Sequence, residues 1–269
     1  MKLGILTARS IRHRYVVGRL REAFPVAAVA YEETGYDPGR VNGTDLTADE
    51  ARIVRHHFTD RDRQEALDFR DHSAFVTTDD VGDVRYLDSG SLNAPATRDF
   101  LLCAGVDTVV VYGTNLVKPP LLDQWPGRMI NLHLGLSPYY RGAGTNFYPL
   151  LNEEPQFVGA TIHLLDAGID SGAILRHARP TIVRDDTPHT IGCKAIAAGV
   201  DALIDVLHGL DAGDVTAVPQ WTVPNARLYR RRDYHPRQVV DLYRKLDAGL
   251  IRQYVDRAAR PAAPIRLVD

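Results

Sequence analysis

Short apolar runs alternate with amphipathic stretches along most of the chain. Apolar runs typical of buried strands occur at 2–7, 26–31, 107–113, 128–133 and 159–165. Between them, apolar residues recur at helical spacing at 14–24, 91–104 and 189–207. Because strands that alternate with helices are joined by right-handed crossovers, we expect an α/β fold with a doubly wound, mostly parallel, Rossmann-like sheet.

Three segments depart from this alternation. Residues 34–49 are rich in glycine, aspartate and threonine, which predicts an exposed loop, and the charged stretch 49–75 predicts one or two surface helices. After about Gly209, residues 215–229 are β-branched, aromatic and interrupted by prolines, as in a short hairpin or edge strands, and 236–254 is helix-like. We therefore expect a main domain over 1–209 and a C-terminal extension, hairpin plus helix, over 210–269.

Composition narrows the class of protein. The 269 residues can bury a substantial core, and 32 basic residues face 34 acidic ones, so no global field would collect nucleic acid or an anionic membrane. No run predicts a signal peptide or a membrane span, which favours a cytoplasmic protein. Cys103 and Cys193 lie in apolar, helix-like patterns without C-x-x-C spacing, so we expect buried free thiols.

Polar residues with acyl-transfer chemistry stand at the end of the run 128–133. Strand alternation sends the side chains of Asn131 and His133 to one face, at the edge of a parallel sheet where ligands collect. An amide can donate to a developing oxyanion, and an imidazole can donate to it or move a proton near neutral pH. Asp170, in a loop flanked by glycines, could orient the imidazole or take the proton of an attacking amine through a water.

The ordered string of motifs around these residues resembles the folate-dependent formyltransferases, which include the glycinamide ribonucleotide, methionyl-tRNA and sugar N-formyltransferases. The family's Asn-x-His, Pro-x-Tyr-Arg-Gly, Gly-x-Thr-x-His and Leu/Ile-Asp-x-Gly motifs are met in order by Asn131, His133, Pro138, Tyr140, Arg141, Gly142, Gly159, Thr161, His163, Asp170 and Gly172. The resemblance is strong over residues 100–180 and loose over 1–30. It implies a one-carbon transferase in which Asn131, His133 and Asp170 form the catalytic triad, with 10-formyltetrahydrofolate as formyl donor and no metal.

The resemblance also implies ligand contacts. Gly113, Thr114 and Asn115 follow a strand at the place where the family holds its pterin, and the loop backbone at Asp166 could contact the folate. For the acceptor, the resemblance points to His163, which could instead lie behind the triad, and to Arg141 in the Tyr-Arg-Gly motif.

A second candidate binding segment lies between the first strand and the first helix, at Ser10, Arg12 and His13. Backbone N–H groups at a helix start, with arginines nearby, are a natural phosphate site. The pattern resembles formyltransferase-like proteins of surface-polysaccharide pathways, and either the folate or a nucleotide diphosphate could use it. An ordinary solvated helix start is the alternative.

The acceptor is less defined than the chemistry. The segment 134–138, Leu-Gly-Leu-Ser-Pro, departs from the Pro-Ser-Leu-Leu-Pro of methionyl-tRNA formyltransferases and looks like the sugar N-formyltransferases. We therefore expect a small-molecule amine acceptor, preferably a nucleotide-linked amino sugar, with an amino acid-derived amine or hydroxylamine as an alternative. Transfer to water, as in formyltetrahydrofolate hydrolases, is another, although those carry a regulatory domain ahead of the catalytic one.

Other acceptors and other classes of protein are disfavoured. Formylation of methionyl-tRNA would call for a further C-terminal domain and a more basic surface than a net charge of −2 suggests, and a glycinamide ribonucleotide enzyme would lack the insertion at 45–75. A metallohydrolase would have to use asparagine, a poor zinc ligand, and the adjacent His56 and His57 should point apart. A non-catalytic binding module would not need the intact triad.

Two predictions concern the extension. We expect a homodimer formed through the strands at 215–229. The run Arg230–Arg232 could bind an anionic acceptor, although such a run is more often a solvated face.

Overall fold

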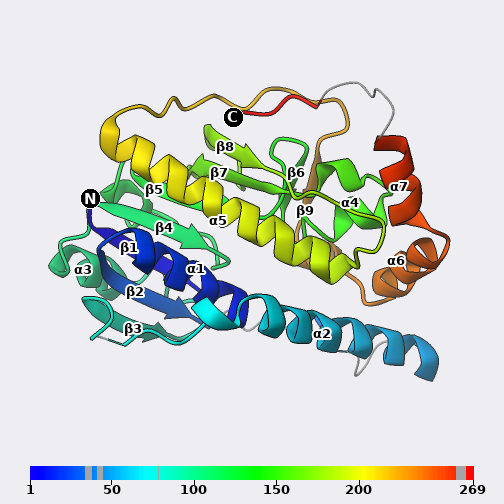
Figure 1. Ribbon diagram of the computed structural model, residues 1–269. Helices are drawn as coiled ribbons and strands as arrows, with labels where there is room; N and C mark the ends of the chain where they lie inside the picture. The colour runs from blue at the N-terminus through cyan, green and yellow to red at the C-terminus, as the bar shows by residue number, and fades with distance from the viewer. Residues whose placement is uncertain (34–37, 41–44, 78, 259–264) are drawn as a thin grey trace.

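A seven-stranded sheet forms the centre of the protein. The computed structural model describes residues 1–33, 38–40, 45–77, 79–258 and 265–269 (Figure 1). The strand order is β3-β2-β1-β4-β5-β7-β8. The first five of these run parallel, whereas β7 is antiparallel to β5 and β8 is antiparallel to β7. The strands are β1 (Leu3–Thr7), β2 (Val26–Glu32), β3 (Asp83–Leu87), β4 (Thr108–Tyr112), β5 (Met129–His133), β7 (Ala160–Leu164) and β8 (Ile174–Ala178).

Helices cover both faces of the sheet, which is why the central strands read as continuous apolar runs. On one face α1 (Ile11–Ala23) and α5 (Pro188–Ala212) pack against the sheet, and on the other lies α3 (Pro95–Cys103) (Figure 1). Every residue of β1 and β4 is buried as a result. The predicted doubly wound, mostly parallel α/β fold is confirmed.

The ends of the two longest helices follow from local chemistry. Thr47 and Glu50 form a capping box at the start of α2 (Ala48–Asp68), the surface helix expected from the charged stretch. Thr187 caps α5, and Gly213, with a φ of 80°, ends it. Because α5 runs on to Ala212, the boundary expected after residue 209 falls inside its last turn. None of the described helices is both long and apolar enough to cross a bilayer.

The predicted hairpin at 215–229 is not formed. Val218 instead makes an antiparallel bridge to Ile174 in β8, and β9 (Arg227–Tyr229) pairs in parallel with β6 (Tyr140–Gly142). Pro219 and Pro224 remove two backbone donors that a ladder between the two halves would need, so each half pairs with the main domain. The backbone of β9 is thus occupied within the chain, and the homodimer stays a prediction.

Several smaller elements differ from the sequence predictions or were missed. The helix expected over 236–254 is two helices, α6 (Arg237–Asp247) and α7 (Leu250–Ala258), separated at Gly249. The strands β3 and β8 were not predicted, and Cys103 is exposed rather than buried because it lies on the outer side of the last turn of α3. Residues 34–37 and 41–44 of the expected loop lie outside the described residues. The remaining helices are α4 (Tyr148–Leu151), η1 (Arg70–His72), η2 (Leu122–Gln124), η3 (Pro155–Phe157) and η4 (Arg231–Asp233).

Candidate active site

Asn131, His133 and Asp170 meet at the end of β5. Asn131 and His133 project from the same face of the strand, and Asp170 comes from the loop between β7 and β8. Asn131 Nδ2 lies 3.2 Å from Asp170 Oδ1, and His133 Nδ1 lies 3.4 Å from Asp170 Oδ2. The sequence prediction that these three side chains converge is confirmed, whereas their catalytic roles stay a prediction.

The carboxylate of Asp170 is buried but well supplied with donors. The backbone N–H of Gly142 donates to Oδ2 at 2.8 Å, and Asn131 donates to Oδ1. Burial alone would raise the pKa of Asp170, but the nearby imidazoles of His133 and His163 and the N–H of Gly142 outweigh it and hold this pKa well below its usual range. Asp170 is therefore an anion throughout the neutral pH range.

His133 stands between two acceptors. Besides Asp170, the carbonyl of Tyr140 lies 3.1 Å from its Nε2. Burial lowers the pKa of His133 in spite of the attraction of Asp170, so the ring is neutral at pH 7. A neutral imidazole has one N–H and can donate to only one of the two acceptors, whereas a protonated ring would satisfy both. The site can thus hold a proton on His133 for the time that a reaction needs it.

His163 fixes the amide of Asn131. Its side chain is fully buried, and its Nδ1 lies 2.8 Å from the carbonyl of Leu164, an acceptor that requires a proton on that nitrogen. Its Nε2 is then free to accept from Asn131 Nδ2 at 3.1 Å. His163 thus lies behind the triad, and its contact with the acceptor stays a prediction.

The Tyr-Arg-Gly motif holds the other side of Asp170. Gly142 has a φ of 92°, and a Cβ at this position would lie 1.9 Å from the carbonyl oxygen of Tyr229, so only glycine allows the N–H to reach Asp170 while β6 pairs with β9. Beside it, the Nε of Arg141 is buried without a hydrogen-bond partner in the described part of the chain. Arg141 thus offers a donor close to the triad.

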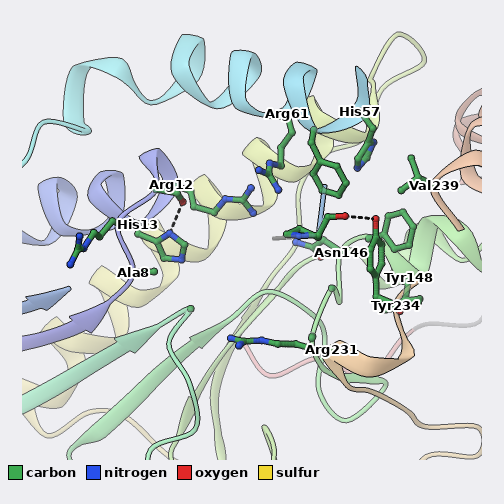
Figure 2. A pocket seen from close by; sticks show the side chains of 18 of the residues that line it. Ala8, Arg12, His13, His57, Arg61, Asn146, Tyr148, Arg231, Tyr234 and Val239 are labelled. Atoms are coloured by element: carbon green, nitrogen blue, oxygen red, sulfur yellow. Dashed lines mark hydrogen bonds between the residues drawn. The ribbon is translucent and has the colours of Figure 1, made fainter. Parts of the chain in front are cut away.

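A cavity of about 750 Å³ opens at the same edge of the sheet (Figure 2), and its lining residues do not include Asn131, His133 or Asp170. It lies where β1, β2 and β4 end, as expected for a parallel sheet. Ala143 and Gly144, which directly follow Gly142, form part of its wall. The start of α1, the inner side of α2 and the C-terminal extension close it, the last through Arg230, Arg231 and Tyr234.

The predicted segment at the start of α1 lines this cavity. Ser10 Oγ lies 2.6 Å from Nδ1 of His13, whose ring packs on Tyr112 at 4.8 Å between centroids. The guanidinium of Arg12 forms an ion pair with the buried Glu65 of α2. The cavity is therefore bordered here by a neutral imidazole and by a guanidinium whose charge is already balanced.

Of the predicted folate contacts, only Gly113 lines the cavity. A Cβ on Gly113 would lie 2.2 Å from His13 Nε2, so a larger residue would displace that ring. Thr114 bonds to the carbonyl of Asn115, whose side chain donates to Glu32 at 2.9 Å. Both residues shape the strand end, and their contact with folate stays a prediction.

Asp166 shapes its own loop. Its carboxylate accepts from the N–H of Gly168 at 3.0 Å and from Ser171 Oγ at 2.8 Å, which fixes the turn that presents Asp170. Its contact with folate also stays a prediction. Within the described ranges, no group of three or more His, Cys, Asp or Glu side chains is placed to hold a metal ion.

One contact at the cavity, between the C-terminal extension and the end of β2, is not predicted by the sequence. Arg231 Nη1 donates to Asn115 Oδ1 at 3.0 Å, and Asn115 in turn bonds to Glu32, so the extension is tied across the cavity to the end of β2. The arginine run 230–232 was the one sequence signal for this contact. The buried His57 and the exposed His56 point apart, as expected for adjacent helical residues.

Comparison with known proteins identifies the family. Residues 39–207 match the formyl transferase family, a stretch that covers more than half of the chain. The chain belongs to this family, and the predicted resemblance is confirmed.

The individual curated relatives align with only part of the chain. The methionyl-tRNA formyltransferase of Synechococcus sp. (strain JA-3-3Ab) is 37% identical over 120 residues, 44% of this chain and 36% of the relative. That of Burkholderia thailandensis is 36% identical over 129 residues, 47% of this chain and 39% of the relative. The chain thus matches less than half of the length of these curated relatives.

Solved structures share the fold. A sugar N-formyltransferase from Shewanella sp FDAARGOS_354 superposes with a TM-score of 0.56 and 17% identity, covering 91% of this chain and 88% of that one. Phosphoribosylglycinamide formyltransferase from Anaplasma phagocytophilum gives 0.54 and 15%, covering 85% and 98%. The N-formyltransferase from Helicobacter canadensis, in complex with folinic acid and dTDP-3-aminofucose, gives 0.52 and 16%, covering 87% and 72%.

Three histidines with lowered pKa values predict acid sensitivity. Desolvation and nearby arginines lower the pKa of His13 to about 3, desolvation with His189 and Arg61 lowers that of His57 to about 3, and desolvation lowers that of His189 to about 4. Unfolded histidines titrate near 6.5. Below that pH the unfolded state binds protons that the folded state does not bind, so the free energy of unfolding falls as the pH drops toward 4. Each histidine adds up to about 1.4 kcal/mol per pH unit to this slope.

Urea unfolding between pH 7 and 4.5 measures this slope. The variant His57→Phe keeps the aromatic contacts of His57 with Phe58 and Phe147, and should flatten the slope by about one proton. An equal slope in the wild type and in His57→Phe would contradict the prediction.

Proposed function

We propose that the protein transfers a formyl group from 10-formyltetrahydrofolate to an amine. The observation that carries this proposal is the convergence of an amide, a neutral imidazole and an ionised carboxylate beside a cavity, in a chain of the formyl transferase family. The solved relative from Helicobacter canadensis was crystallised with folinic acid, a formylated folate. This supports the same class of donor here.

In this reaction the amine nitrogen attacks the formyl carbon, and the bond from that carbon to N10 of the folate breaks. Asn131 donates an N–H to the oxygen that becomes negative, and His133 donates or relays a proton beside it. Asp170 takes a proton of the attacking amine, directly or through a water, and this proton ends on the departing N10. The products are a formamide and tetrahydrofolate.

The structure suggests how Asn131 is held for this role. Its two N–H bonds point at His163 and Asp170, at distances of 3.1 and 3.2 Å, which are long for such contacts. A small rotation would direct one N–H to the oxyanion while the other stays on its partner. The N–H that turns is the one that faces the His163 ring, because the bond to the carboxylate of Asp170 is itself charge-assisted.

Substitution of the triad tests the proposal. Asn131→Ala, His133→Ala and Asp170→Asn should each lower the rate of formyl transfer by about 10²–10⁴-fold, the usual cost of losing an oxyanion donor or an acid/base group. Tetrahydrofolate release in single turnovers is the measurement, with circular dichroism as a check of folding. A folded triad variant with near wild-type turnover would remove that residue from the mechanism.

For the acceptor, we propose a nucleotide-linked amino sugar. Among the described residues, five arginines line the cavity; Arg12 and Arg61 pair with Glu65 and Asp62, which leaves Arg9, Arg230 and Arg231 against Glu32 and Glu33. Such a lining suits an anionic ligand, and a volume of about 750 Å³ suits a small molecule. The curated relatives favour methionyl-tRNA as a second candidate, but the formal net charge of −2 is a weak field for that polyanion.

Comparison of Arg230 with Arg232 tests whether the arginine run acts through a contact in the cavity or through overall charge. In the described residues no carboxylate pairs with its side chain, and it lines the cavity, whereas the neighbouring Arg232 does not. Arg230→Gln should raise the acceptor KM about 10-fold, since a charge-assisted contact to a phosphate is worth about 1.5 kcal/mol or more. Arg232→Gln should leave it unchanged. Equal effects of the two variants would show that the run acts only through overall charge.

A further inference from the structure

A smaller compartment lies behind the main cavity, under α2 and against the first turns of α5. This inner chamber has a volume of about 130 Å³ and is walled on one side by apolar side chains, among them Leu134, Leu150 and Leu242. It shares part of its wall with the main cavity, and the shared residues are Arg12, His57, Arg61, Asn146 and Phe147. Figure 2 shows two of them, Arg12 and Arg61, reaching into the main cavity from α1 and α2.

Three polar atoms at the chamber are buried without a hydrogen-bond partner in the described ranges: Arg12 Nε, His57 Nδ1 and Asn146 Nδ2. The orientation of the Asn146 amide is set, because its oxygen accepts from the N–H of Gly159 at 3.0 Å. Its nitrogen is therefore a donor, as the Nε of Arg12 must be. An unmet buried donor costs about 1–3 kcal/mol, so two of them beside one chamber indicate that a ligand with acceptor atoms satisfies them.

The charges around the chamber are balanced. Arg12 pairs with Glu65, and Arg61 donates through Nε and Nη2 to Asp62 at 2.9 and 2.6 Å. His57 and His189 have lowered pKa values, mainly through burial, and are neutral at pH 7. An anion bound here would be buried without a free counter-charge, which costs much free energy. A neutral group that accepts hydrogen bonds would not carry this cost.

We propose that the inner chamber binds an uncharged, oxygen-bearing group of the acceptor substrate, a carbonyl or a hydroxyl, and so selects the amine that is formylated. This deepens the proposed function and rests on it. In a nucleotide-linked amino sugar such oxygens come from the nucleobase or from the sugar. The anionic part of the acceptor would remain in the main cavity, near Arg230.

Gly192 allows the chamber to be filled without disturbing the fold. It lies in α5 and lines the chamber, and a Cβ added there meets no other atom within 4 Å. Gly192→Leu should therefore fold and occupy the chamber, whereas Gly192→Ala adds one methyl and leaves most of it open. Asn146→Asp is a second variant, which keeps the acceptor for Gly159 and replaces the donor by a carboxylate.

The experiment measures binding of uridine, N-acetylglucosamine and inorganic phosphate by ligand-observed NMR titration. We expect at least one of the two neutral probes to bind the wild type and Gly192→Ala, and to bind at least about 10-fold more weakly to Gly192→Leu and Asn146→Asp. Whether uridine or N-acetylglucosamine binds identifies the base or the sugar as the source of the oxygen. Phosphate binding should be equal in the wild type and the two Gly192 variants; Asn146→Asp is left out of this comparison, because it adds a negative charge to the wall of the main cavity.

Three outcomes would overturn the proposal: no binding of either neutral probe, unchanged binding in folded Gly192→Leu, or loss of phosphate binding in that variant. Thermal melts establish that each variant is folded. Formyl transfer is assayed separately on the wild type. Absence of transfer to every amine offered would defeat the proposed function, while the titrations would still decide whether the chamber binds neutral groups.

Discussion

The site depends on one buried carboxylate, that of Asp170. Its backbone has a positive φ of 47°, and the loop that carries it is fixed from outside by Gln220, which donates to the carbonyls of Asp170 and Gly172 at 2.8 and 2.9 Å. Burial would raise the pKa of this carboxylate, and here the imidazoles of His133 and His163 and the N–H of Gly142 lower it instead. Since Gly142 belongs to β6, which pairs with β9, the C-terminal extension helps to keep the carboxylate ionised.

The sequence predicts the parts of this arrangement that depend on local periodicity. Buried parallel strands are continuous apolar runs, and strand alternation places Asn131 and His133 on one face, so both the fold class and the meeting of the triad could be expected. The edge strand β3 has a largely exposed, charged sequence, and no periodicity marks it. The hydrogen bonds that link Glu32, Asn115 and Arg231 join residues far apart in the chain, and no local pattern encodes such a contact.

The two compartments differ in electrostatic character. In the main cavity Arg9, Arg230 and Arg231 stand against Glu32 and Glu33, whereas the two arginines that also line the inner chamber, Arg12 and Arg61, each pair with a carboxylate. This division matches a ligand with one charged part and one neutral part.

The central claim is that the triad moves a formyl group from folate to an amine rather than to water. The most direct measurement mixes the protein with 10-formyltetrahydrofolate labelled with ¹³C in the formyl group and a nucleotide-linked amino sugar, and follows the label by NMR. We predict that the label appears as a formamide on the sugar nitrogen, with one tetrahydrofolate released for each. Label that appears as free formate, or that stays on the folate with every amine tried, would contradict the claim.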